Sequence, residues 1–163
     1  MVKADQFVQY VIRPALKSIN MNCLAAEQLL LGTACAESRL GTYIHQVNGP
    51  ALGVFQMEPA THFDLWDRYI RYRMELKLQL LHMIPPDMHG KVGGAPSPDL
   101  LITDLRYAAI MARLLYRRSP KPLPEPGDWL SMAMMWKLVY NTPRGKGTVE
   151  HFMESLDECH ALM

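Results

Sequence analysis

Apolar residues recur every three or four positions along most of this chain, and proline or glycine interrupts the pattern at intervals. In the first such segment they are Phe7, Val8, Val11, Ile12, Ala15, Leu16 and Ile19. This spacing places apolar side chains on one face of a helix, whereas a strand would need strict alternation. We therefore expect an all-α fold.

The interruptions and the capping residues delimit six predicted helices. They span residues 4–19, 23–40, 59–83, 99–117, 129–140 and 148–161. Asn22, Asp128 and Thr148 are the expected N-caps, and Gly41 is expected to close the second helix. The helix over 129–140 is apolar on most of its surface, so we expect it to be the buried central helix. The stretch 85–98, rich in proline and glycine, is expected to be a loop.

Length and charge set the broad class of the protein. A chain of 163 residues without repeats fits a single domain over 1–163. The formal net charge of +1 gives no reason to expect binding to nucleic acid, and no apolar run is long enough for membrane insertion. Three cysteines without metal-ligand spacing make a disulfide framework or a zinc site unexpected. We expect no metal and no cofactor.

One carboxylate stands out against this background. Glu37 follows the apolar stretch 29–36 and falls in the last turn of the second helix. The helix dipole disfavours negative charge there, and partial burial would also raise the pKa of the side chain. A carboxyl group protonated near neutral pH can protonate a glycosidic oxygen. Taken alone, an ion pair with an arginine or a solvent-facing side chain explains Glu37 at least as well.

Two further elements change that balance. A stretch of the form Gly-x-x-Gln-x-x-Pro-x-Thr follows Glu37-Ser38, and Tyr140-Asn141 ends a later helix. The matching residues of the stretch are Gly53, Gln56, Pro59 and Thr61. This order resembles the lysozyme-like superfamily, in particular soluble lytic transglycosylases and goose-type lysozymes, and is most like phage-encoded members. The resemblance runs from about the second helix to Gly147, although residues between the second and third elements match only as helical pattern.

The resemblance implies a lysozyme-like fold with a substrate cleft and a role for each matching residue. Glu37 would be general acid and then general base, and Ser38 would fix the helix end. Gln56 would bind a substrate N-acetyl group or the Glu37 carboxyl. Tyr140 would point its hydroxyl toward Glu37, and Asn141 would contact backbone or sugar. The alternatives are simple packing for Ser38, a loop-stabilising amide for Gln56 and a core aromatic for Tyr140.

Glu58 departs from the family pattern, because many members have an apolar residue there. Extended backbone would turn Glu58 to the same side as Gln56, where it could activate water as the second carboxylate of an inverting hydrolase. Alternatively, Glu58 caps the helix that starts at Pro59. His62 and Asp64 are lesser candidates on that helix. The product therefore stays open between a hydrolysed end and the 1,6-anhydro end of a lytic transglycosylase, which the resemblance favours.

The expected function is cleavage of the MurNAc-GlcNAc β-1,4 bond in peptidoglycan glycan strands by a phage lytic transglycosylase or lysozyme. The alternative is a phage virion structural or wall-binding protein with a lysozyme fold and little activity, in contact with other tail proteins. An unrelated helical interaction module is a third possibility. The polar start of the chain is not a signal peptide. We therefore expect synthesis in the host cytoplasm, followed by carriage in the virion or release to the periplasm.

Overall fold

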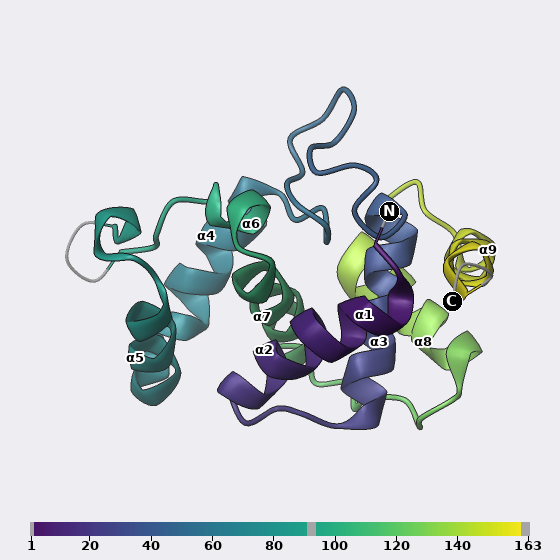
Figure 1. The fold of residues 1–163 in the computed structure, drawn as a ribbon, viewed down its shortest axis with the longest axis horizontal. Helices are drawn as coiled ribbons and strands as arrows, with labels where there is room; N and C mark the ends of the chain where they lie inside the picture. Colours follow the sequence, from purple (N-terminus) through teal and green to yellow (C-terminus); the bar gives the residue numbers. More distant parts are fainter. Residues whose placement is uncertain (1, 91–93, 161–163) are drawn as a thin grey trace.

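The structure, a computed structural model, describes residues 2–90 and 94–160 and is built of helices (Figure 1). The α-helices are α1 (Ala4–Phe7), α2 (Arg13–Ser18), α3 (Leu24–Ser38), α4 (Pro59–Arg68), α5 (Met74–Met83), α6 (Leu100–Thr103), α7 (Leu105–Arg117), α8 (Trp129–Met135) and α9 (Val149–His160). The π-helical segments are η1 (Val8–Ile12) and η4 (Trp136–Asn141), and the 3-10 segments are η2 (Ile70–Tyr72) and η3 (Pro86–Met88). Across the described residues there is no strand, so the all-α prediction is confirmed.

Helix α3 is the most enclosed element of the fold. Its apolar side chains point to all sides of the helix axis, and 12 of its 15 residues are buried. A helix of that kind needs neighbours on every side. Helices α7, α8 and α9 and the segment η1 pack around it. The helix that carries Glu37 is therefore the central one.

The expectation that residues 129–140 form the central helix is wrong. In α8 and η4, the side chains of Leu130, Met134 and Leu138 are 57%, 51% and 45% exposed. Their opposite face is buried, with Met132 and Trp136 almost inaccessible to solvent. Apolar composition alone does not show how many sides of a helix its neighbours cover. Here α3 and α9 pack against α8, and part of its surface stays in water.

Two predicted helices are broken by contacts between side chains and backbone. The helix predicted over residues 59–83 is two helices in the structure: α4 ends at Arg68, and α5 starts after Arg73. The Arg73 guanidinium stacks on the Tyr69 ring at 3.6 Å and donates a hydrogen bond to the Tyr69 carbonyl at 3.0 Å. The range 99–117 breaks at Asp104, whose carboxylate accepts a hydrogen bond from the Tyr107 N–H at 3.0 Å.

Most helix ends agree with the expected capping residues. Asp128 accepts from the N–H of Ser131 at 3.1 Å, and the Thr148 hydroxyl accepts from the N–H of His151 at 3.1 Å. The predicted cap Asn22 is wrong by one position, because the N-cap of α3 is Cys23. Residue 161 and residues 91–93 of the predicted loop lie outside the described residues.

The end of α3 is a left-handed turn. Arg39, Leu40 and Gly41 have φ angles of 49°, 52° and 80°. Gly41 takes the left-handed conformation expected of a closing residue, but the helix itself already ends at Ser38. This turn redirects the chain into the loop over residues 42–57.

Two further predictions concern cysteines and membranes. All three cysteines are free thiols, and Cys35 is buried as expected of a small apolar residue. Within residues 2–90 and 94–160, no helix combines the length and the apolar character that a membrane crossing requires.

Helices α3 and α9 approach closely at one point, and this contact gives a testable prediction. A Cβ atom added to Gly32 of α3 would overlap the ring of Phe152, which is fully buried. Glycine to alanine normally stabilises a helix by about 1 kcal/mol. We expect Gly32→Ala instead to lower the free energy of unfolding by about 1–3 kcal/mol, measured by urea denaturation, because the ring has no room to retreat.

A second variant separates this steric effect from other causes. Phe152→Leu in the Gly32→Ala background should recover part of the loss, because the smaller side chain leaves space for the new methyl group. Unchanged or increased stability of Gly32→Ala alone would contradict the proposed overlap.

Candidate functional site

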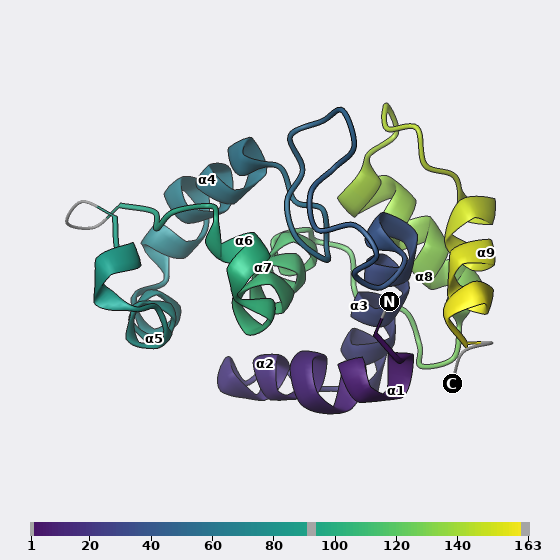
Figure 2. The ribbon, with the colours of Figure 1, turned by 45° about the horizontal axis from the view of Figure 1, so that its top comes forward.

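A cavity of about 790 Å³ lies beside the last turn of α3. Its walls come from the loop over residues 42–57, the start of α4, the end of α7, and η4 with the turn that follows it. Figure 2 shows this loop and the turn over residues 142–148 rising on the same side of the molecule. Glu37, Gln56, Glu58, Tyr140 and Asn141 all line the cavity. Ser38 and the two lesser candidates, His62 and Asp64, are not among its lining residues.

Glu37 is partly buried at the wall of the cavity. Its Oε1 accepts a hydrogen bond of 2.9 Å from the indole Nε1 of Trp136. Burial raises the pKa of Glu37 from 4.5 to about 7, and the Trp136 bond opposes this rise. In the part of the chain that the structure describes, Glu37 forms no ion pair. The pairing with an arginine that the sequence left open is therefore absent there.

Ser38 ties the end of α3 to the neighbouring loop. Its buried hydroxyl donates to the carbonyl of Val54 at 2.6 Å and accepts from the N–H of Gly41 at 2.9 Å. The side chain fixes the helix end, which is the role expected of it. It holds the loop against the turn that carries Glu37.

Gln56 stabilises its own loop. Its backbone is left-handed, with φ 46°, and its side-chain amide donates to the carbonyl of Gly53 at 2.9 Å. Gly53 has φ 77°, and a Cβ there would overlap the carbonyl of Leu101. The contact of Gln56 is thus the loop-stabilising alternative rather than a bond to Glu37. Gln56 still lines the cavity.

The hydroxyl of Tyr140 does not bond to Glu37, which differs from the expectation. It donates to the carbonyl of Phe55 at 2.7 Å, and a phenol has only one proton to give. The ring packs against Tyr116, with ring centroids 5.4 Å apart. Burial, with the nearby charge of Glu37, raises the pKa of Tyr140 well above its ordinary value. Tyr140 therefore braces the loop, and Trp136 bonds to the acid.

Asn141 belongs to a small polar cluster on the opposite wall. Its side-chain oxygen accepts from the ammonium group of Lys137 at 2.9 Å. The same ammonium donates to the carbonyl of Gly145 at 2.7 Å. Lys137 thus joins the end of η4 to the turn after it. Asn141 thus contacts the Lys137 side chain, and its expected contact with a sugar stays a prediction.

Glu58 is exposed at the start of α4 and lines the cavity with Glu37. It is the N-cap residue of α4, yet its side chain makes no capping hydrogen bond. The capping alternative therefore rests only on the favourable placement of negative charge at a helix start.

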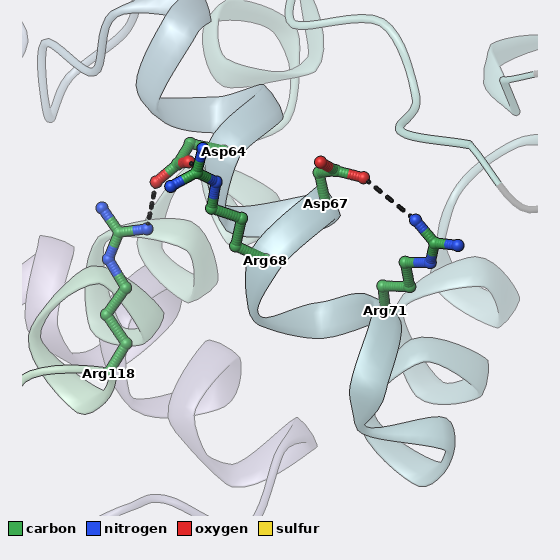
Figure 3. Close-up of polar contacts among 5 residues, drawn as sticks. All are labelled: Asp64, Asp67, Arg68, Arg71 and Arg118. Atoms are coloured by element: carbon green, nitrogen blue, oxygen red, sulfur yellow. Dashed lines mark hydrogen bonds and ion pairs between the residues drawn. The ribbon is translucent and has the colours of Figure 1, made fainter.

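Asp64 is engaged in ion pairs that join α4 to the end of α7. Its two oxygens lie 2.6 Å from Nη1 of Arg118 and 3.2 Å from Nε of Arg68 (Figure 3). Arg118 itself lines the cavity. A second pair, Asp67 with Arg71 at 3.4 Å, lies further along the same surface. Asp64 thus has a structural role and is not free to act as a base.

His62 is fully buried and lies outside the cavity lining. Its Nε2 lies 2.7 Å from the hydroxyl of Tyr107, which also accepts from the indole of Trp66 at 2.8 Å. Burial lowers the pKa of His62 to about 4, so the ring is neutral at pH 7. In residues 2–90 and 94–160, no group of three or more His, Cys, Asp or Glu side chains could hold a metal ion.

Sequence reasoning missed Trp136 as a partner of Glu37. The signal was present, because Trp136 precedes Tyr140 by four residues and such residues share a helix face. A buried indole N–H needs an acceptor, and the Glu37 carboxyl, expected to lie near Tyr140, is one such acceptor.

Ser38 provides a stability test of the loop attachment. Ser38→Ala removes a buried hydroxyl and leaves the Val54 carbonyl and the Gly41 N–H without that partner. We expect the free energy of unfolding to fall by about 1–3 kcal/mol in urea denaturation. Ser18→Ala is the matched control, because the Ser18 hydroxyl bonds only to the Ala15 carbonyl of its own helix. This variant should lose less of the free energy of unfolding. Equal losses would contradict the role of Ser38 in holding the loop.

Glu37 provides a test through the pH dependence of stability. Its folded-state pKa of about 7 exceeds the ordinary 4.5, so its stabilising contribution is complete below pH 4.5 and is lost as pH rises through 7. Glu37→Gln does not ionise. Relative to wild type, the variant should gain up to about 3 kcal/mol between pH 4.5 and pH 8, measured by urea denaturation at both values. A difference independent of pH would contradict the raised pKa.

No family model, no curated protein and no solved structure matched the chain when it was compared with known proteins.

Proposed function

We propose that the protein is a peptidoglycan-degrading enzyme with a lysozyme-like fold, which cleaves the MurNAc-GlcNAc β-1,4 bond with Glu37 as general acid. The observation that carries this proposal is a carboxyl group with a pKa of about 7 at the wall of a cavity of about 790 Å³. Near neutral pH a large fraction of Glu37 is protonated, as a general acid requires.

The resemblance to lysozyme-like enzymes gains support from where its elements meet. Glu37, Gln56 and the Tyr140-Asn141 pair come from three distant parts of the chain, and all line one cavity. A chance match of three short motifs would not require their side chains to converge. The volume of the cavity is within the range of small-ligand sites.

The proposed reaction begins with Glu37 as general acid. The protonated carboxyl gives its proton to the glycosidic oxygen while the bond from that oxygen to C1 of MurNAc breaks. On the route to an anhydro end, the resulting carboxylate then takes a proton from the attacking hydroxyl as the new bond to C1 forms. The amides of Gln56 and Asn141 are in the cavity wall, where they can bind N-acetyl groups of the glycan.

The identity of the nucleophile decides the product. Attack by the C6 hydroxyl of the same MurNAc gives a 1,6-anhydro end and needs one carboxylate. Attack by water gives a reducing end and would use Glu58 as base. The second route is supported by the position of Glu58, which lines the cavity and makes no capping hydrogen bond. The resemblance favours the first route. Use by a phage, to open or lyse a host wall, rests on the resemblance alone.

Digestion of purified peptidoglycan, with products identified by mass spectrometry, tests this proposal. Glu37→Gln should release fewer muropeptides by a factor of about 100 or more. Glu58→Gln should leave the rate unchanged if the products carry anhydro ends, and should abolish cleavage if they carry reducing ends. Glu125→Gln, at an exposed position outside the cavity, is the matched control and should behave as wild type.

Two outcomes would overturn the enzymatic proposal. One is full activity of Glu37→Gln. The other is no release by wild type at any pH between about 5 and 8, the range in which a carboxyl with a pKa near 7 changes its charge. Sedimentation of the inactive protein with wall sacculi would then favour the virion structural or wall-binding role.

A further inference from the structure

Trp136 reaches Glu37 from the start of η4. Its indole Nε1 donates to Oε1 of Glu37 at 2.9 Å, and this is the one hydrogen bond to that carboxyl within the described residues. Two tyrosines lie near, but their hydroxyls have other partners. Tyr140 donates to the Phe55 carbonyl, and Tyr116 pairs with the Thr33 hydroxyl at 2.7 Å. Of these three side chains, only the indole of Trp136 therefore donates to Glu37.

The position of the indole is fixed by packing. Trp136 is 1% exposed, and its ring contacts the ring of Phe152 with centroids 5.6 Å apart. The ring of His151 lies on it at 6.2 Å. On a third side, a Cβ added to Gly147 would overlap the indole edge. An indole enclosed in this way cannot turn its N–H toward another acceptor without repacking the core.

An indole N–H can only donate, and it does not ionise in the range where carboxyl groups titrate. In a protonated carboxyl one oxygen carries the proton and the other keeps its lone pairs exposed. The carbonyl oxygen of a carboxylic acid is a much better acceptor than its hydroxyl oxygen, so the oxygen that accepts from Trp136 is the unprotonated one. Oε1 is thereby assigned as the acceptor, and the proton belongs on Oε2.

Glu37 lines the cavity, whereas Trp136 is not part of its described lining. Of these two side chains, the carboxyl is therefore the one that a substrate in the cavity could meet.

We propose that Trp136 is a positioning residue, which holds Oε1 of Glu37 and so keeps the transferable proton on the other oxygen, Oε2. The role of that proton in cleavage rests on the proposed function. The orientation of the carboxyl does not, so the two can be tested separately.

The test is a titration of the Glu37 carboxyl by carbon-13 NMR in protein labelled at glutamate, with Glu37→Gln to assign the signal. Trp136→Phe keeps an aromatic ring and removes the donor. Because the bond from Trp136 opposes the rise in the pKa of Glu37, its loss should move the titration midpoint to higher pH, by about one pH unit.

A merely structural role for Trp136 predicts the opposite result. A looser core would admit water to Glu37, and the midpoint would fall toward 4.5, the ordinary pKa of the group. A falling or unchanged midpoint overturns the proposal. Trp129→Phe is the matched control on the same helical run: its ring contacts His160, and the Glu37 midpoint should not move.

A second measurement covers the case in which Trp136→Phe does not fold. Biosynthetic replacement of tryptophan by its benzothienyl analogue exchanges the N–H for sulfur and keeps the shape of the ring. The chain has three tryptophans, and of these only Trp136 bonds to Glu37. The midpoint should again rise, and no rise would overturn the proposal.

Cleavage assays then separate this inference from the proposed function. If wild type cleaves peptidoglycan, Trp136→Phe should lower kcat by about 10-fold or more with little change in KM, because the acid is no longer aligned. An active enzyme with an unchanged midpoint refutes the role of Trp136 alone. An inactive wild type whose midpoint rises in the variant refutes the proposed function alone.

Discussion

The burial of one carboxyl group at the end of the central helix is the constraint around which this structure is arranged. Helix α3 is apolar on every side, so the surrounding helices cover it along its length. Glu37 lies in its last turn, where water is partly excluded and the helix dipole is unfavourable. Burial outweighs the compensating bond from Trp136, and the pKa rises to about 7. That arrangement costs stability at neutral pH, which is expected where function and stability conflict.

The helices could be predicted from the sequence because apolar spacing and capping residues are local signals. The breaks at Tyr69 and Asp104 could not, because they depend on how the chain meets itself. In the first, Arg73 folds back over the Tyr69 ring and bonds to its carbonyl. Composition also misled for residues 129–140. Leu130 and Leu138 suggested a central helix, but α8 is covered on part of its surface only.

The sequence predicted which residues line the cavity better than it predicted the hydrogen bonds that they form. Glu37, Gln56 and Asn141, which the motifs singled out, line one cavity together with Glu58, which departs from the family pattern. The shared helix face makes both Trp136 and Tyr140 candidates for the bond to Glu37. The sequence does not choose between them, because the reach of each side chain depends on the local helical geometry. The segment η4 is π-helical, and such turns recur at functional sites. In this geometry Trp136 meets the acid, and the Tyr140 hydroxyl is left to bond to the Phe55 carbonyl.

The central claim is that the cavity beside Glu37 holds a glycan strand. Binding of a GlcNAc-MurNAc tetrasaccharide to nitrogen-15-labelled Glu37→Gln, followed by NMR, tests it most directly because no turnover is needed. The account predicts saturable shifts at residues that line the cavity, among them Gln56, Asn141 and Lys146. Residues of the remote helix α5 should show none. Absence of saturable binding, or shifts confined to surfaces away from the cavity, would contradict the account.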